Sequence, residues 1–242
     1  MKDKTRKLIQ VILLLILLFS LYKIGAYYRA GGAYDRGVQK IQAQVQDQEK
    51  EDQAPNQSPD QKSIEKIQAL KKTYPEIKAW IFLDQTEINY PVVQGKDNDY
   101  YLNHSYEKEA NPFGAIFMDY RNKADFSDQN TIIYGHNAKR GGCFKDLHQY
   151  ENPDFVSQAP YIEIDSLAGH KRYEIFAVYK ADPRDPFRHT SYQGQDLENF
   201  RVYIQKRNIL KRPLPEKLDH FITLQTCSPG DTRLVIQAVQ AQ

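Results

Sequence analysis

The chain has 242 residues, of which 40% are hydrophobic, 12% aromatic and 26% charged. This balance excludes a mostly disordered chain and a membrane protein with several spans. Its 33 Lys and Arg residues are nearly matched by 31 Asp and Glu, so the net charge of +2 indicates no nucleic-acid partner. Two cysteines allow at most one disulfide and exclude a four-cysteine zinc site. A globular body with a distinct N-terminal segment remains.

The N-terminal segment is basic and then apolar. Residues 1–7 are rich in Lys and Arg, and residues 8–24 are almost entirely apolar. A run of about 17 residues is the short end of a transmembrane helix and also fits the apolar part of a secretory signal. In both cases the basic flank keeps the N-terminus cytoplasmic and the rest of the chain is exported. We expect residues 1–28 to form a retained signal anchor, with a cleaved signal peptide as the alternative.

A change in composition follows the apolar run. Residues 29–62 are rich in Gln and contain Gly and Pro but few apolar side chains. We therefore expect an extracellular linker, with loose helix at most over residues 37–51. As a random coil it would span on the order of 30 Å and lift the following domain clear of the lipid headgroups.

The remaining residues, 63–242, are expected to form one domain. Ser63 is a candidate N-cap for a helix that ends near Thr73, before Tyr74-Pro75. A second helix is expected at 195–208 and a short one at 142–149. Segments rich in β-branched and aromatic residues predict strands at 79–83, 88–93, 115–118, 131–134, 161–165, 170–180, 220–226 and 233–239. About eight strands and few helices indicate a closed or nearly closed β-barrel.

Cys227 and Arg233 are separated by a short turn between two predicted strands. If residues 228–232 form the loop, Cys227 and Arg233 are cross-strand partners with Cβ atoms about 4.5–5.5 Å apart. A two-residue turn at Pro229-Gly230 would instead pair Cys227 with Thr232. In the first register the guanidinium lies beside the thiol, where it favours the thiolate and is able to donate to an oxyanion.

A thiol with a free pKa of about 8.5 needs a base or a cation nearby to react at neutral pH. His136 is the best candidate because it follows a strand-like run and a glycine, where a side chain can face a cleft. His136, Cys227 and Arg233 also have a purely structural interpretation. His136 would be a histidine whose hydrogen bonds are all made within the fold, Cys227 a small buried side chain, and Arg233 a surface charge. Spacing alone leaves both interpretations open.

The motifs nevertheless resemble those of a known family. Thr-Leu-Gln-Thr-Cys227, followed by Arg at the start of the next strand, is similar to the signature of sortases. The stretch Tyr-Gly-His136-Asn, with Phe144 eight residues on, resembles their histidine motif. The resemblance is to class B sortases and extends over residues 79–81, 88–93, 97–104, 116–122 and the helix at 195–208. It implies a mainly β fold, namely a closed eight-stranded sortase-like barrel with an N-terminal helix and one longer helix before the cysteine strand.

The resemblance also implies a mechanism. Cys227 would attack the carbonyl of the Thr in a C-terminal sorting signal, and His136 would act as general acid and base. Arg233 would hydrogen-bond the substrate carbonyl or the developing oxyanion, with the Thr226 side chain or a backbone N–H near Cys227 completing the hole. The implied substrate-binding residues are Thr226, Asn137 and Tyr134.

The implied partners are a secreted protein with a sorting signal and an amine acceptor. The acceptor would be the cross-bridge of a peptidoglycan precursor or a pilin Lys. The protein would be a single-pass protein of the cell membrane with its catalytic domain outside. We expect no cofactor, metal or nucleic acid. A thiol protease or amidase that transfers the acyl group to water, and a non-catalytic surface barrel, remain as alternatives.

Two features depart from the class B pattern. The loop between Cys227 and Arg233 has only five residues, whereas class B sortases usually carry a longer loop with a helical turn, so the substrate preference can differ. Cys143 lies where the family tends to have a small polar or apolar residue. We interpret Cys143 as a packing residue, with an inactivating disulfide to Cys227 as the alternative.

Overall fold

The computed structural model describes residues 2–51, 57–138, 142–227 and 232–241, with Cys227 described through its backbone alone. The α-helices are α1 (Lys2–Glu51), α2 (Pro59–Thr73), α3 (Pro153–Gln158) and α4 (Gly194–Arg207). The 3-10 helices are η1 (Tyr100–Leu102), η2 (Lys145–Glu151) and η3 (Pro186–Arg188). The strands are β1 (Ile77–Phe82), β2 (Asn89–Val93), β3 (Phe117–Met118), β4 (Asn130–Tyr134), β5 (Tyr161–Ser166), β6 (Gly169–Ala181), β7 (Phe221–Cys227) and β8 (Arg233–Gln240).

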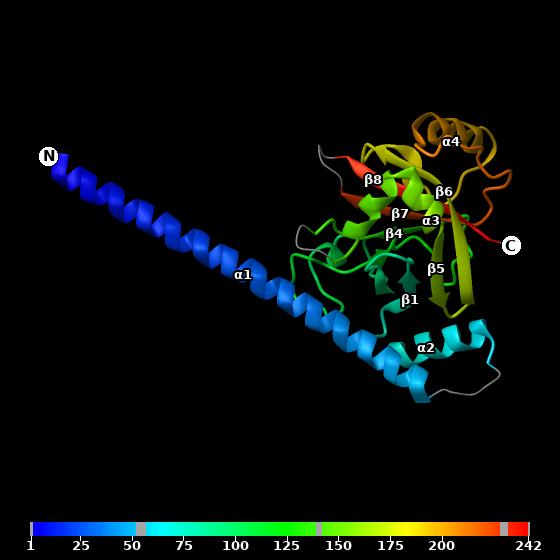
Figure 1. Cartoon of the computed structure of the whole chain (residues 1–242), viewed down its shortest axis with the longest axis horizontal. Coiled ribbons are helices and arrows are strands. Elements are labelled where there is room, and N and C mark those ends of the chain that lie inside the picture. Colours follow the sequence, from blue (N-terminus) through cyan, green and yellow to red (C-terminus); the bar gives the residue numbers. More distant parts are fainter. Residues whose placement is uncertain (1, 52–56, 139–141, 228–231, 242) are drawn as a thin grey trace.

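The eight strands close into one barrel in the order β1-β2-β3-β4-β7-β8-β6-β5 (Figure 1). The β2–β3 and β4–β7 pairs are parallel and the other pairs are antiparallel. The prediction of a closed, mainly β barrel is therefore confirmed. The expected helix at 142–149 is instead the 3-10 helix η2, which begins after Phe144.

Alternating side chains of the strands form two apolar clusters. Ile222 and Leu224 of β7 belong to the larger cluster, which fills the barrel and continues beneath α2 and the docked half of α1. Phe221 belongs to a second cluster, in which α4 contributes Phe200 and Ile204. The period of two along β7 explains this division, because successive side chains point to opposite faces of the sheet. Helix α4 therefore covers the outer face of the barrel near the strand that ends at Cys227.

Helix α2 begins earlier than the sequence suggested. Ser58, rather than Ser63, is the N-cap, because its Oγ accepts a hydrogen bond from the Gln61 N–H at 3.2 Å and Pro59 occupies the first turn. Ser63 lies inside the helix and is buried. Its hydroxyl donates to the carbonyl of Ser166 at 3.3 Å and accepts from the Ser166 N–H at 3.0 Å. The prediction that Ser63 is the N-cap was wrong, because its hydroxyl instead forms hydrogen bonds that connect α2 to the end of β5.

Helix α1 runs without interruption over 50 residues, so the expectation of coil at residues 29–36 was wrong, and residues 37–51 form a regular rather than a loose helix. At 1.5 Å per residue, its length is about 75 Å. Tyr34, Val38, Ile41 and Val45 are buried against the domain. Their spacing of four, three and four residues is that of one helix face. Most residues between these four are polar, so the overall composition of residues 29–51 did not indicate a helix with an apolar face. Residues 52–56 of the expected linker lie outside the described residues.

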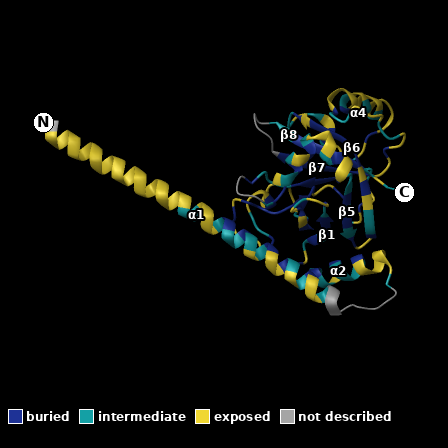
Figure 2. Ribbon diagram, viewed as in Figure 1, coloured by how far each residue is buried: buried dark blue, intermediate teal, exposed yellow. Residues whose placement is uncertain are grey.

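The two halves of α1 have different surroundings, as Figure 2 shows. The large apolar side chains of residues 8–24 are exposed, each at 47% or more, whereas those of the second half contact the domain. Among the described residues, α1 is the one helix long and apolar enough to cross a membrane. Polar contacts reinforce its docked half, since Gln42 Nε2 donates to the Asn89 carbonyl at 2.8 Å and Lys40 pairs with Glu107 at 2.7 Å.

The docked half of α1 should contribute to the stability of the domain. We expect Ile41→Ala to lower the free energy of unfolding by about 2–4 kcal/mol, because it removes a fully buried side chain and leaves a cavity. Gln46→Ala, at an exposed position of the same helix, is the matched control. Urea unfolding of the full chain in detergent micelles measures both. Equal stability of the two variants would contradict the docking.

Candidate active site

The register across three strands brings the predicted catalytic positions to one edge of the barrel. Tyr134 of β4 pairs with Gln225 of β7, and Cys227 of β7 pairs with Arg233 of β8. Since alternate residues point to the same face, Cys227 lies on the face of Gln225, with Arg233 directly opposite. The first of the two predicted registers is therefore the observed one. The Pro229-Gly230 turn lies outside the described residues.

His136 follows β4 at the same edge. The Gly135 N–H donates to the Gln225 carbonyl at 3.2 Å, which extends the β4–β7 pairing up to the histidine. A Cβ at Gly135 would lie 2.6 Å from the Phe144 ring, so only glycine allows this close approach. His136 is thus two residues beyond Tyr134, just as Cys227 is two residues beyond Gln225.

The imidazole of His136 has a defined hydrogen-bond partner. Its Nε2 lies 2.6 Å from the carbonyl oxygen of Leu102, at the end of η1. A carbonyl oxygen only accepts, so Nε2 carries the hydrogen. In the neutral ring Nδ1 is then the basic nitrogen, and in the imidazolium Nδ1–H is the second donor. The side chain is half-exposed.

The segment after His136 folds back on itself. The Phe144 N–H donates to the His136 carbonyl at 2.9 Å, and Asn137 pairs with Cys143. Asn137 is half-exposed beside the histidine. Cys143 is a free, buried thiol whose Sγ donates to the Phe113 carbonyl at 3.4 Å. Burial raises the pKa of Cys143 to about 11, so the thiol stays protonated at neutral pH. These observations agree with Cys143 as a packing residue.

The other two predicted substrate-binding residues are both buried. Thr226 is fully buried and pairs with Leu234, which belongs to the cluster inside the barrel. Its side chain therefore points inward, away from the face of Cys227, which leaves only its backbone available to a substrate. Tyr134 donates its hydroxyl to Asp119 Oδ2 at 2.7 Å, and its ring packs on Phe117.

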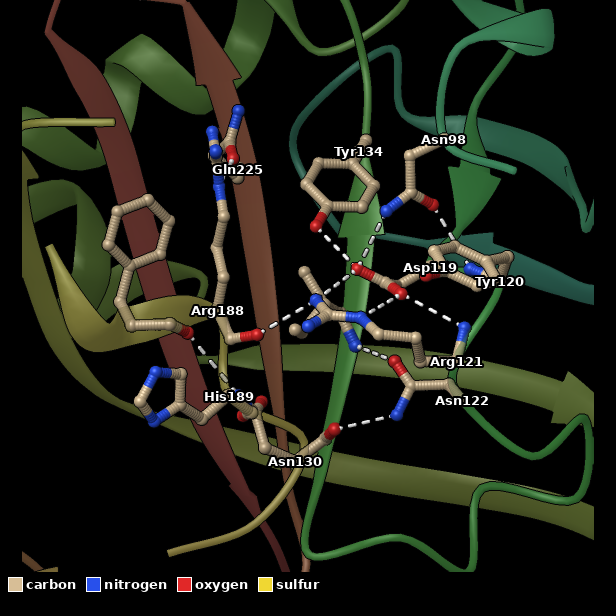
Figure 3. Close-up of polar contacts among 12 residues, drawn as sticks. Asn98, Asp119, Tyr120, Arg121, Asn122, Asn130, Tyr134, Arg188, His189 and Gln225 are labelled. Atoms are coloured by element: carbon tan, nitrogen blue, oxygen red, sulfur yellow. Dashed lines mark hydrogen bonds and ion pairs between the residues drawn. The ribbon is translucent and has the colours of Figure 1, made fainter. Parts of the chain in front are cut away.

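Asp119 is the centre of a polar network on this outer face (Figure 3). Its carboxylate accepts from Arg121 Nε at 2.8 Å, Arg121 Nη2 at 2.7 Å and Asn98 Nδ2 at 3.0 Å, besides the Tyr134 hydroxyl. Burial alone would raise the pKa of Asp119. The hydrogen bonds from Arg121 and Tyr134 outweigh burial and hold this pKa below its usual range. Burial also raises the pKa of Tyr134, with the neighbouring Asp119 charge adding to the effect.

The network extends to β7 through η3. Arg121 Nη2 donates to the Arg188 carbonyl at 2.9 Å, and Arg188 Nε donates to Gln225 Oε1 at 2.8 Å (Figure 3). Burial lowers the pKa of Arg188, and the nearby charge of Arg233 acts in the same direction. The Arg188–Gln225 bond places this guanidinium on the face that Gln225 shares with Cys227 and Arg233.

Apart from Tyr134, the residues of this network were not predicted to belong to the site. Residues 97–104 and 116–122 contributed only to the family resemblance. The sequence Asp119-Tyr-Arg121 contained a usable signal, because a carboxylate and a guanidinium two residues apart at the end of a strand often pair through a turn. Arg188 and Gln225 had no local signal, since their meeting depends on the barrel bringing η3 onto β7.

Comparison with known proteins assigns the family. Residues 81–241 match the Sortase domain model. The chain is 36% identical over 179 residues to sortase B of Listeria monocytogenes, which covers 72% of this chain and 73% of that relative. It is 31% identical over 237 residues to sortase B of Staphylococcus aureus, with coverages of 96% and 94%. The structure of the Staphylococcus aureus sortase B–substrate complex matches with a TM-score of 0.77 and 28% identity, over 88% of this chain and 98% of that chain.

The closed mixed barrel and these matches show that the chain belongs to the sortase family of cysteine transpeptidases. The relatives and the solved structure are class B sortases, which confirms the class indicated by the motifs.

The Asp119 network should make stability depend on pH. Because the folded pKa of Asp119 is depressed, its contribution is present above the unfolded pKa of about 3.9 and is lost as the pH falls through the folded value. We expect Asp119→Asn to lower the free energy of unfolding at pH 7 by about 3 kcal/mol. Breaking a buried ion pair costs about 3–5 kcal/mol, and the lower value applies here because the Arg121 side chain is 41% exposed.

Urea unfolding of the wild type and Asp119→Asn between pH 7 and pH 3 measures this difference, which should shrink below about pH 4. Asp219→Asn, at an exposed carboxylate, is the control and should match the wild type throughout. A difference that stays constant down to pH 3 would show that the carboxylate charge is not what the network uses.

Proposed function

We propose that this sortase is a membrane-anchored transpeptidase in which Cys227 is the nucleophile, His136 the general acid and base, and Arg233 the oxyanion donor. The observation that carries the proposal is the shared register of β4, β7 and β8. It supports placing a thiol, an imidazole and a guanidinium at one edge of the barrel and on one face.

The proposed reaction begins with attack of the Cys227 thiolate on the carbonyl carbon of the Thr in a sorting signal. The tetrahedral oxyanion receives a hydrogen bond from Arg233, and a backbone N–H near Cys227 is the second donor. As the C–N bond breaks, the His136 imidazolium donates its Nδ1 proton to the departing amine. A thioacyl enzyme and a neutral histidine result.

The second half of the reaction reverses the proton transfer. Neutral His136 accepts a proton at Nδ1 from the incoming amine while the nitrogen attacks the thioester carbonyl. The C–S bond breaks, Cys227 leaves as a thiolate, and a new amide bond joins the protein to the acceptor. The Nε2–H bond to the Leu102 carbonyl supports this assignment, since it leaves Nδ1 for both transfers.

The proposed partners follow from the reaction and from α1. The donor is a secreted protein with a C-terminal sorting signal, and the acceptor amine belongs to a peptidoglycan precursor or to a pilin Lys. The exposed apolar residues 8–24 support a membrane span, with the basic flank inside and the barrel on the extracellular face. An acceptor fixed near that face competes with water for the thioester.

The test is a panel of sorting-signal peptides incubated with the protein, with and without triglycine or hydroxylamine, and read by mass spectrometry. We expect cleavage after Thr, diversion of the product to an amine adduct, and no product from Cys227→Ala. His136→Ala should lose about 10²–10⁴-fold in kcat/KM and Arg233→Ala about 10²–10³-fold. His220→Ala and Arg184→Ala, at exposed positions, are the matched controls.

The same assay separates the alternatives. A product that ignores added amines would support a thiol protease or amidase. Activity retained in Cys227→Ala would overturn the proposed mechanism. A methanethiosulfonate reagent followed by peptide mapping provides a substrate-free check, since the reactive thiol should be Cys227 and not the buried, protonated Cys143.

A further inference from the structure

We propose that α1 is a positioning element for His136, so that the helix bearing the apolar N-terminal span also sets the orientation of the imidazole. The inference rests on the proposed role of His136 as the acid and base. It goes beyond that role because it gives a part in catalysis to α1, which is separated from the first strand of the barrel by α2. Two independent sets of contacts carry it.

The first set joins α1 to the segment that follows His136. The Tyr34 ring lies against Gly142, since a Cβ on that glycine would be 3.5 Å from Tyr34 Cε1. Gly142 has a φ of +77°, and the next residue, Cys143, has a φ of +52°, so the backbone here is held in a left-handed conformation. Cys143 pairs with Asn137 beside the histidine. Tyr34 therefore supports the return path of the segment that begins at His136.

The second set joins α1 to the segment that holds the imidazole in place. Asn111 Nδ2 donates to the Ala30 carbonyl of α1 at 2.9 Å. The Asn111 N–H donates to the Asn103 carbonyl at 2.8 Å, next to Leu102, whose carbonyl accepts from His136. A side-chain hydrogen bond to α1 and a backbone bond thus fix the segment that orients the ring.

Phe113 joins the two sets. Its ring centroid is 6.0 Å from that of Tyr34 and 5.1 Å from that of Tyr27, both on α1. Its carbonyl accepts from the Cys143 thiol at 3.4 Å. The chain before and the chain after the histidine therefore meet at one aromatic cluster, and α1 supplies two of its rings. Figure 1 shows α1 passing beside the barrel toward α2.

Such support matters because catalytic groups must be held within about 0.5 Å of their productive positions. A displacement of 1 Å can reduce the rate about 100-fold. Loss of α1 contacts would loosen both the Leu102 carbonyl and residues 142–144, which bond back to His136 and Asn137. The ring would then exchange between orientations, and Nδ1 would no longer be reserved for the substrate.

Substitutions at different positions along α1 distinguish a role in positioning His136 from a purely structural role of the helix. Val45 lies on the same buried face as Tyr34 but about three turns further on, where it lines a cavity of about 390 Å³ with Ser63 and Lys66 of α2. Val45→Ala therefore removes buried apolar surface of α1 without touching the segments around His136. It is the matched control for Tyr34→Ala.

The experiment uses the full chain in detergent micelles, labelled with ¹⁵N-histidine, with the His136 signals assigned through His136→Gln. Three quantities are compared among the wild type, Tyr34→Ala, Tyr34→Phe and Val45→Ala: the Tm, the ¹⁵N tautomer signature of His136, and kcat with KM for the active sorting-signal peptide. We expect Tyr34→Ala to lower kcat about tenfold or more with little change in KM, and to reduce the Nε2–H tautomer.

Tyr34→Phe keeps the ring and should restore both readouts, because the contacts with Gly142 and Phe113 are made by the ring of Tyr34. Val45→Ala should lower the Tm but leave kcat and the tautomer unchanged. If Tyr34→Ala fails to fold, Tyr34→Leu serves for the same comparison.

An unchanged His136 spectrum and kcat in a folded Tyr34 variant would overturn the proposal, as would equal effects of Tyr34→Ala and Val45→Ala on kcat. The tautomer signature needs no turnover. A failure of the proposed function, seen as activity in Cys227→Ala, is therefore distinguishable from a failure of this inference.

Discussion

The parallel pairing of β4 with β7 is the constraint on which the candidate site depends. Parallel neighbours end at the same edge of a sheet, so the residues that follow β4 and β7 meet there. Strand β8 is antiparallel to β7 and begins at that edge with Arg233. A slip of one residue in either pairing would turn Cys227 or Arg233 to the opposite face. The apolar interior prevents this slip, because Ile222, Leu224 and Ile236 would have to leave the barrel.

The outer face of this edge is held by polar rather than apolar contacts. Asp119 gathers donors from three parts of the chain, and Arg188 continues the connection to β7. A buried carboxylate is costly unless its lone pairs are filled, and here Arg121, Tyr134 and Asn98 fill them. The result is a connected set of polar groups that reaches Gln225, two residues before Cys227 on the same strand. These contacts also hold the Arg121 and Arg188 guanidinium groups on this face of the barrel.

The sequence was sufficient for the closed barrel, because its strands depend on local patterns. Alternating β-branched and aromatic residues mark the strands, and motifs at the ends of β4 and β7 mark His136 and Cys227. The sequence was insufficient where a residue's role depends on a distant partner. Ser63 is of a residue type that often caps helices, yet its hydroxyl is hydrogen-bonded to Ser166, which is distant in sequence. Thr226 lies next to Cys227 in sequence but on the opposite face, because strand side chains alternate.

Helix α1 shows the same limit on a larger scale. Its second half has the composition of a linker, and an isolated helix of that composition gains little stability in water. It is helical here because Tyr34, Val38, Ile41 and Val45 fall on one face and the barrel offers a surface for them. A flexible linker would leave the barrel free to tumble relative to the apolar half of α1. A continuous helix, with one half apolar and exposed and the other docked, fixes the orientation of the barrel relative to that apolar half. Some of the contacts that fix this geometry, namely those of Tyr27, Ala30 and Tyr34, lie on the segments around His136, and through them we propose that α1 also positions the imidazole.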